Sequence, residues 1–360
     1  MTINQLLQQL EPTSPILQAS FGLERESLRI SKQSQTVAQT PHPVSLGARS
    51  YHPYIQTDYS EPQLELITPV AQSSKEALRF LTAITDVAQR SMDREEYLWP
   101  LSMPPKLKEE DIPIADLDDP FEVSYRHYLA EKYGKKLQSM SGVHYNIELG
   151  KDFIADLFRV SGYASEVHFK NDLYLKLAQN FIRYHWLLTY LYGAAPIAQQ
   201  GFLKEDLTDC VRSIRNSDLG YVNDSDVQVS YESLETYVQS IEDCVNDGRL
   251  IAEKEFYSPV RLRGSKHNRD YLTQGVTYLE CRSFDLDPFH HLGISQETLD
   301  TTHLFILALL WLDSPQQVTK ELETAKDLNH QIALSHPLEA LPDKAPLKDI
   351  LTAMAAVIQH

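Results

Sequence analysis

Alternating apolar and polar positions mark several segments of the chain as β-strands. In Gly142–Leu149, the apolar residues Val143 and Tyr145 alternate with the polar residues His144 and Asn146. Because successive side chains of a strand point to opposite faces, one face of this strand is apolar and the other is polar. The same kind of pattern predicts strands over Phe21–Ile30, Gln63–Thr68 and Val276–Phe284.

The last of these strands places an acid and an arginine two residues apart. A period of two puts Tyr278, Glu280, Arg282 and Phe284 on one face, and Leu279 and Cys281 on the other. An isolated pair of this kind most often forms a cross-strand ion pair. A functional role for it therefore needs support from the other segments.

Apolar residues at helical spacing predict three helices. The first begins at Ser73, whose hydroxyl and Glu76 make a capping box ahead of apolar Leu78, Leu81, Ile84 and Ala88. A second runs from about Val167 to Tyr192 and ends at Gly193. A third, from about Gln296 to Leu312, is apolar almost all round, which is typical of a buried helix.

Helix-like and strand-like segments alternate without a linker-like stretch between them. This predicts the α+β class, with an antiparallel or mixed sheet that carries helices on one face and chemistry on the other. We expect one catalytic domain over residues 1–335, whose completeness at its C-terminal end is open. Residues 336–360, which are rich in proline, are predicted to form a tail with one short helix.

Composition narrows the classes of partner. The chain has 33 Lys and Arg against 50 Asp and Glu, a formal charge of -17, which disfavours nucleic acid and anionic membranes as partners. The N-terminus shows no signal peptide, and the longest apolar run, residues 304–312, is too short to span a bilayer. Three cysteines without a CxxC pair fit a reducing compartment. We therefore expect a soluble cytoplasmic protein.

Acidic side chains recur among the β-forming segments. Glu24 and Glu26 share one face of a strand, and further candidates follow in the other segments: Asp58, Glu61, Glu65, His144 and Glu280. Each segment alone has a structural explanation, such as a solvated sheet edge or a structural histidine. Together they would gather many anions on one sheet, which is costly unless cations lie between them. Carboxylates with one imidazole and no clustered thiols favour Mg²⁺ or Mn²⁺ over structural zinc.

Metal ions of this kind most often bridge nucleotide phosphates during phosphoryl transfer. The chain contains no Walker-type GxxxxGK[ST] motif and no GxGxxG motif. Side-chain cations and metals must therefore hold the phosphates, and Arg126, Arg261, Arg263 and Lys266 are the candidates. The alternative for the last three is a solvated basic turn.

Four motifs then give the chain a specific resemblance. Phe21–Arg29, Trp99–Pro104, Ser141–Asn146 and Arg215–Tyr221, in this order, resemble those of glutamate–cysteine ligases. The similarity extends from about residue 20 to about residue 315, and it is strongest to the N-terminal ligase module of the bifunctional glutathione biosynthesis proteins of bacteria. In those proteins an ATP-grasp glutathione synthetase follows, and this sequence contains no such domain.

The resemblance implies a glutamine-synthetase-like fold, in which an antiparallel sheet forms a funnel that holds ATP, metals and glutamate. It assigns metal binding to Glu24, Glu26, Asp58, Glu65, His144 and Glu280, with Glu61 as a nearby acid. The implied catalytic residues are Glu24, Glu280 and Arg282. Glutamate binding falls on Asn146, Arg215 and Arg282, and ATP binding is assigned to Arg126, Arg261 and Arg263. The cysteine pocket falls on Tyr59, Tyr125, Leu129, Gln138, Met140, Tyr221 and Tyr257.

The implied reaction joins glutamate to cysteine, with ATP as co-substrate and two or three Mg²⁺ or Mn²⁺ ions. Its product, γ-glutamylcysteine, is the first intermediate of glutathione biosynthesis, so a glutathione synthetase activity, fused or separate, is the expected functional partner. Two alternatives stay open at this point. One is a related carboxylate–amine ligase that uses another amine, and the other is a truncated remnant that binds nucleotide or glutamate but turns over poorly.

Overall fold

One antiparallel sheet organises the protein. A computed structural model describes residues 2–11, 13–341 and 344–359, so parts of the predicted domain (1 and 12) and tail (342–343 and 360) lie outside the described residues. The sheet has seven strands in the order β2-β3-β1-β5-β7-β6, and β4 pairs with β1 beside this path. Every strand pair is antiparallel, so the sheet is not mixed. The strands are β1 (Ala19–Ser31), β2 (Ile55–Thr57), β3 (Gln63–Ile67), β4 (Glu96–Leu98), β5 (Gly142–Leu149), β6 (Val260–Arg263) and β7 (Tyr278–Asp285).

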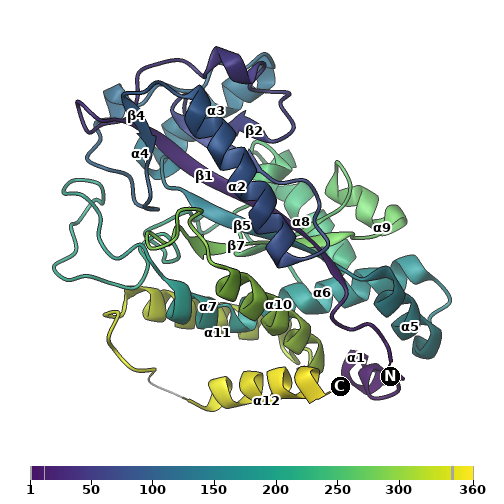
Figure 1. Ribbon diagram of the computed structural model, residues 1–360. Coiled ribbons are helices and arrows are strands. Elements are labelled where there is room, and N and C mark those ends of the chain that lie inside the picture. The colour runs from purple at the N-terminus through teal and green to yellow at the C-terminus, as the bar shows by residue number, and fades with distance from the viewer. Residues whose placement is uncertain (1, 12, 342–343, 360) are drawn as a thin grey trace.

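Helices surround this sheet and confirm the α+β class. Figure 1 shows α2 lying across the sheet, while α7, α10, α11 and α12 gather on one side of the molecule. Helix α2 packs on β1 and β3, and helix α6 packs on β6 and β7. The helices are α1 (Ile3–Leu7), α2 (Ser74–Ser91), α3 (Pro120–Tyr133), α4 (Lys135–Gln138), α5 (Lys151–Ser161), α6 (Glu166–Tyr184), α7 (Trp186–Tyr192), α8 (Leu234–Asn246), α9 (Tyr271–Gln274), α10 (Gln296–Trp311), α11 (Val318–Leu334) and α12 (Ala345–Gln359).

The main core lies between the apolar face of the sheet and these helices. Leu23 of β1, Tyr145 of β5 and Leu279 of β7 are fully buried and belong to one cluster with Phe181 of α6 and Leu309 of α10. Burial of such side chains stabilises the fold by roughly 1.5–3 kcal/mol each. The alternation in β5 and the apolar character of α10 are therefore confirmed, because both follow from burial against this core.

The predicted start of α2 is confirmed in its main feature. The side-chain oxygen of Ser73 accepts a hydrogen bond from the backbone N–H of Glu76, at 3.1 Å. The Glu76 carboxylate accepts from the N–H of Gln72 rather than from that of Ser73. Half of the expected capping box is thus formed, and the other half is shifted by one residue.

Three helix predictions need correction. The expectation that the first helix begins at Ser73 is wrong, because α1 precedes it. The helix predicted over Val167–Tyr192 is two helices, α6 and α7, which meet at His185. The His185 ring bonds the carbonyl of Ile182, the acceptor that residue 186 would use in a continuous helix. The short helix expected in the tail is α12, which has 15 residues and packs on α10.

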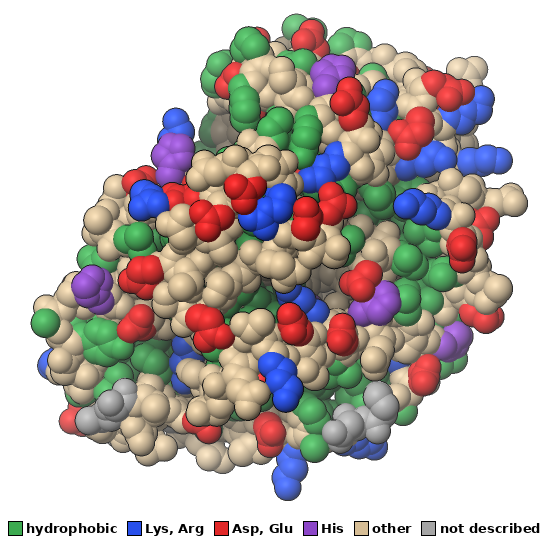
Figure 2. Space-filling view, turned by 180° about the vertical axis from the view of Figure 1, so that it is seen from behind, with side chains coloured by type: hydrophobic (Ala, Val, Ile, Leu, Met, Phe, Trp, Pro, Cys, Tyr) green, Lys and Arg blue, Asp and Glu red, His purple; other side chains and the backbone are tan. Residues whose placement is uncertain are grey.

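The outer surface agrees with the charge pattern of the sequence. Figure 2 shows acidic and basic side chains interspersed over the face that it presents, with no single basic patch among the residues drawn in colour. Among the described residues, none of the helices has both the length and the apolar character needed to cross a bilayer.

Candidate active site

The polar face of the sheet brings the predicted metal-site residues together. Residues directly opposite each other on paired strands share a face. The observed register pairs Glu24 with His144, Glu26 with Glu65, and Asn146 with Glu280. Residues that are far apart in the sequence thus form one continuous polar surface across β3, β1, β5 and β7.

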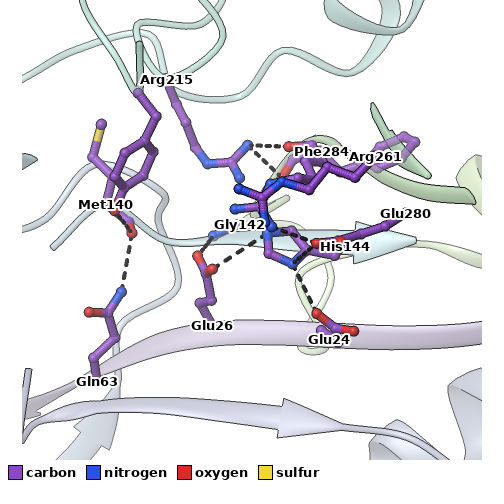
Figure 3. A network of polar contacts seen from close by, with 12 residues as sticks. Glu24, Glu26, Gln63, Met140, Gly142, His144, Arg215, Arg261, Glu280 and Phe284 are labelled. Atoms are coloured by element: carbon purple, nitrogen blue, oxygen red, sulfur yellow. Dashed lines mark hydrogen bonds and ion pairs between the residues drawn. The ribbon is translucent and has the colours of Figure 1, made fainter. Parts of the chain in front are cut away.

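His144 lies at the centre of this surface. Its Nδ1 forms a 3.0 Å hydrogen bond with Oε2 of Glu24 and lies 3.5 Å from Oε1 of Glu280. Its Nε2 lies 3.5 Å from Oε1 of Glu26 (Figure 3). The amide of Asn146 donates to the other oxygen of Glu24 at 2.8 Å. One buried imidazole therefore stands among three carboxylates.

Two acids of this surface, Glu65 and Asp58, have raised pKa values. Burial, followed by the nearby charges of Asp58 and Glu24, raises the pKa of Glu65 well above its usual value. Burial and the charge of Glu26 raise the pKa of Asp58 to about 6. Donor atoms of Glu24, Glu65 and His144 all lie within 4.8 Å of one another. An oxygen-rich donor set with one imidazole and unbalanced negative charge is chemically suited to a hard divalent cation.

Glu280 differs from the other acids because arginines neutralise it. Its Oε1 lies 2.5 Å from Nη1 of Arg282, and its Oε2 lies 3.1 Å from Nε of Arg263. Burial alone would raise the pKa of Glu280, but Arg282 and Arg261 hold it well below its usual value. The ion-pair explanation for this segment is thus correct as far as it goes. The Glu280–Arg282 pair lies within one strand, and Arg263 adds the cross-strand partner.

A bulge in β7 changes the face on which Phe284 lies. The prediction that Phe284 shares the face of Glu280 is wrong. β7 has one extra residue between the pairs Cys281–Tyr145 and Phe284–Val143, so the alternation reverses after Cys281. Phe284 therefore joins the core, where its ring centroid lies 6.3 Å from that of Tyr145.

Arg215 reaches the polar face from the loop that follows α7. Its Nη1 donates to the backbone carbonyls of Arg282, at 3.1 Å, and Phe284, at 3.2 Å. Its guanidinium lies directly over Gly142, as Figure 3 shows. A pocket of about 440 Å³ opens beside Arg215 and Arg282, with Asn216, Tyr221, Tyr257 and Ser283 in its wall. The two arginines predicted to bind glutamate thus share one pocket.

Part of the predicted cysteine pocket adjoins these arginines. The rings of Tyr221 and Tyr257 lie 5.4 Å apart, and the Gln138 amide donates to the Tyr257 hydroxyl at 3.4 Å. The carbonyl of Met140 accepts from the hydroxyl of Tyr221, at 3.4 Å, and from the amide of Gln63, at 3.2 Å. These side chains form one connected wall beside the acidic surface.

The other predicted members of that pocket belong to a second apolar cluster. Tyr59, Tyr125 and Leu129 pack with Leu28 and Ile30 of β1. By strand alternation, Leu28 and Ile30 lie on the same face as the acids of β1, so this cluster covers the polar face at one end. Burial, and after it the nearby hydroxyl of Tyr257, raises the pKa of Tyr125. The two groups of predicted residues are therefore neighbours.

The arginines assigned to ATP do not form one group. Arg126 donates through Nε to the carbonyl of Asp58, at 2.7 Å, and pairs with Glu122, at 2.8 Å. Arg261 and Arg263 lie on β6, at the opposite edge of the sheet. The alternative of a solvated basic turn is wrong for these two, because they are in a paired strand. Lys266, beyond the end of β6, is exposed.

Glu61 is directed away from the acidic surface. Its Oε1 accepts the N–H of His42, at 2.7 Å, and its Oε2 pairs with Arg49. The structure thus gives Glu61 a role in fixing the loop that follows β1. The acids whose charges raise the pKa of Glu65, after the effect of burial, are Asp58, Glu24, Glu26 and Glu280.

Sequence reasoning missed two residues of the polar face. Gln63 precedes Glu65 by two positions on β3 and points to the same face, so period two could have found it. Its amide oxygen is buried and has no hydrogen-bond partner among the described residues. Asp285 was missed because the bulge that turns it toward Gly142 leaves no signal in the residue pattern.

Comparison with known proteins gives a consistent set of matches. A family model described as glutamate–cysteine ligase matches residues 4–332. The glutathione biosynthesis bifunctional protein of Streptococcus mutans serotype c is 64% identical over 360 residues, which are 100% of this chain and 48% of that protein. The chain therefore spans about half the length of the curated relatives that it matches.

Two crystal structures resemble this fold closely. A bifunctional glutathione synthetase from Pasteurella multocida matches with a TM-score of 0.89 and 44% identity, over 99% of this chain and 46% of that one. A glutamate–cysteine ligase from Francisella tularensis, solved in complex with AMP, matches with a TM-score of 0.87 and 26% identity, over 95% of this chain and 78% of that one.

Proposed function

Since the chain belongs to the glutamate–cysteine ligase family, we propose that it joins the γ-carboxylate of glutamate to the amino group of cysteine, with cleavage of ATP to ADP and phosphate. The observation that carries the proposal is the joint geometry of the polar face. An acidic surface centred on His144 lies next to a pocket that contains Arg215 and Arg282. The acidic surface suits the metal ions that phosphoryl transfer uses, and the arginines of the pocket suit a dicarboxylic substrate.

The acidic surface is proposed to bind two or three Mg²⁺ or Mn²⁺ ions. The unbalanced carboxylate charge fits such ions, and so does Nε2 of His144, which lies 3.5 Å from Glu26 but has no hydrogen-bond partner among the described residues. When bound, the ions neutralise the phosphate oxygens of ATP. The proposed ligands are Glu24, Glu26, Asp58, Glu65, His144 and Glu280.

The side chains around the surface would position the reactants. Arg282 and Arg215 can hold the α-carboxylate of glutamate, since a guanidinium binds a carboxylate through paired N–H donors. Asn146 adds a hydrogen-bond acceptor to the site, because its buried amide oxygen has no hydrogen-bond partner among the described residues. The γ-carboxylate is then free to attack the γ-phosphorus of ATP. Arg261, Arg263 and, from the other edge of the sheet, Arg126 supply positive charge for the phosphates.

The second step needs the amine of cysteine next to the γ-glutamyl phosphate. We place the cysteine between the Tyr221–Tyr257 wall and the cluster that contains Tyr125, because these border the acidic surface. The amine attacks the acyl carbon, phosphate leaves, and one proton is released. No covalent bond to the protein is needed, so the protein contributes positioning and charge.

The polar face also carries our proposal for the fold family. The polar face, with its edges at β2 and β6, would form the inner wall of a glutamine-synthetase-like funnel. The product would be consumed by a glutathione synthetase activity, which the names of the bifunctional relatives support. We place the reaction in the cytoplasm, where the unpaired thiols Cys210, Cys244 and Cys281 would stay reduced.

The test is ADP release by the purified chain with ATP and Mg²⁺. Glutamate alone, cysteine alone, both together, and glutamate with 2-aminobutyrate or other amines are compared. We expect strong turnover only with glutamate and either cysteine or 2-aminobutyrate. Preference for an unrelated amine would replace cysteine in the proposal, and a folded chain that binds ATP without turnover would favour the remnant alternative.

A further inference from the structure

The bulge in β7 places a buried acid behind the substrate pocket. Without the bulge, Asp285 would share the core face of Cys281. With it, Asp285 stands opposite Gly142, on the face of the sheet that carries the acidic surface. Its side chain is completely buried. Bulges next to active sites often re-aim one side chain in this way.

Asp285 is surrounded by donors, and one of them belongs to a predicted substrate-binding residue. The backbone N–H of Ala194 donates to Oδ2 at 2.8 Å, and the amide of Asn216 donates to Oδ1 at 3.2 Å. The guanidinium Nη1 of Arg215 lies 3.8 Å from the same Oδ1. Among the described residues, this carboxylate is the acid that pairs with Arg215.

The same acid is part of a longer polar network. The carbonyl of Asn216 accepts from the amide of Asn329 on α11, at 2.8 Å. The oxygen of that amide accepts from the hydroxyl of Thr189 on α7, also at 2.8 Å. The network ties the loop that carries Arg215 to two helices, and Asn216 and Asn329 also line the pocket. Arg215 thus extends from an anchored loop.

We infer that Asp285 is a positioning residue, which holds Arg215 in the orientation that receives the carboxylate of glutamate. The inference rests on the proposed function, because it takes Arg215 as a substrate-binding residue. The guanidinium has little freedom: Gly142 lies beneath it, and two backbone carbonyls accept from one side. Those carbonyls carry no net charge, whereas Arg282, which lines the same pocket, is a second cation. The Asp285 carboxylate supplies the charge that keeps Arg215 beside Arg282 in a buried place.

Two effects of removing Asp285 oppose each other. An aspartate partly neutralises Arg215, so its loss could strengthen the attraction of glutamate. The loss also leaves a buried guanidinium without its counter-charge and with a like charge beside it. We expect the second effect to dominate, because a carboxylate is bound well only by a guanidinium whose donors are already aimed at it.

The experiment compares steady-state kinetics of the whole 360-residue chain and its variants. We expect Asp285→Asn to raise the KM for glutamate by about tenfold or more, with the KM for ATP and kcat changed by less than about twofold, as the loss of binding that is equal in the ground state and the transition state requires. Glu96→Gln is the matched control. It also neutralises a buried carboxylate that pairs with an arginine, Arg29 at 3.0 Å, and it does so at β4, away from the pocket.

A double-mutant cycle separates positioning from general stability. If Asp285 acts through Arg215, then Asp285→Asn should change the KM for glutamate by less than about twofold when Arg215 is already Lys. Additive effects, an unchanged KM in the single variant, or a lower KM would overturn the inference. If the wild-type chain shows no glutamate-dependent turnover, the proposed function fails first, and the inference fails with it.

A second variant covers the case in which Asp285→Asn does not fold. Asn216→Ala removes one donor from the same carboxylate and keeps its charge. It should raise the KM for glutamate by a smaller factor in the same direction. An unchanged KM in folded Asn216→Ala, together with an unfolded Asp285→Asn, would assign Asp285 to the stability of the fold alone.

Discussion

The guanidinium of Arg215 occupies the space that a side chain at Gly142 would need. A Cβ at residue 142 would lie 2.3 Å from Nη2 of Arg215, closer than non-bonded atoms approach. The N–H of the same glycine donates to Oε2 of Glu26, at 3.0 Å. One residue without a side chain thus adjoins both the arginine proposed to bind the substrate and a carboxylate proposed to bind metal.

This contact predicts a selective defect in Gly142→Ala. The added methyl group would push the Arg215 guanidinium out of place, because the carbonyls beside it leave it no equivalent position. We expect the KM for glutamate to rise by about tenfold or more, while binding of ATP, measured by calorimetry, changes little.

Gly22→Ala is the matched control for this prediction. Gly22 of β1 lies opposite Asn146 of β5. A Cβ at Gly22 would lie 3.5 Å from Cβ of Asn146, an ordinary contact distance. Its effect on the KM for glutamate should be clearly smaller. Equal effects of the two alanines would mean that strand disruption, rather than displacement of Arg215, explains the loss.

Repulsion within the acidic surface predicts how metal binding changes stability. Burial, and after it the neighbouring carboxylates, raises the pKa of Glu65 well above its usual value, so its charge is unfavourable when no cation is bound. In EDTA, Glu65→Gln should therefore unfold at a higher temperature than the wild type. With saturating Mg²⁺ the wild type should gain more than the variant, since a ligand that binds only the folded state stabilises it by mass action.

Glu61→Gln tests whether the effect belongs to the acidic surface. Glu61 is in the same segment, but it pairs with Arg49 instead of joining that surface. Its substitution should leave the Mg²⁺-induced rise in the unfolding temperature unchanged. A loss of that rise in Glu61→Gln, or its retention in Glu65→Gln, would contradict the assignment of the ligands.

The sequence could predict most of the polar face because that face obeys period two. Residues 19–25 of β1 pair with β5, and residues 24–28 of β1 pair with β3, without a shift of register, so Glu24, Glu26, His144 and Asn146 keep their expected face. Burial of the alternate positions fixes this register, since a slip by one residue would expose the core. Strand positions of this kind can be read from a single sequence.

The rest depends on tertiary contacts that leave no local pattern. The bulge that sends Phe284 into the core is one extra residue of β7 opposite β5, and it shows only in the pairing of the two strands. The break at His185 is a local exception: its ring bonds the carbonyl of Ile182, three residues earlier, and a histidine within a helical pattern does not by itself predict such a bond. Glu61 looks like another metal ligand in the sequence, and only the loop that carries Arg49 draws it away.

The role proposed for Arg282 predicts a strong effect of a conservative change. Lysine keeps the charge beside Glu280, but it lacks the planar fork of donors that binds a carboxylate through two N–H groups. We expect Arg282→Lys to lower kcat/KM for glutamate by about 10- to 100-fold. Arg269→Lys, at an exposed pair with Glu242, is the control and should have wild-type kinetics. Wild-type kcat/KM in Arg282→Lys would exclude bidentate binding.

Acid sensitivity of the fold is predicted from His185. Burial, opposed by its bond to the Ile182 carbonyl, lowers the pKa of His185 to about 4. The unfolded chain, with a pKa near 6.5, binds a proton more readily between these values, so the free energy of unfolding falls as pH drops from about 6.5 to about 4. At pH 5 this one residue should contribute a loss of about 2 kcal/mol relative to pH 8.

Urea unfolding of His185→Gln at pH 8 and pH 5 measures this contribution. Glutamine can donate to the same carbonyl but does not titrate, so the variant should lose less stability between the two pH values than the wild type. Part of the loss should persist, because burial also lowers the pKa of His42 and of His303 to about 4. His267→Gln, at an exposed position, should behave as the wild type does. If His185→Gln and the wild type lost equal stability, His185 would not be the residue that takes up the proton on unfolding.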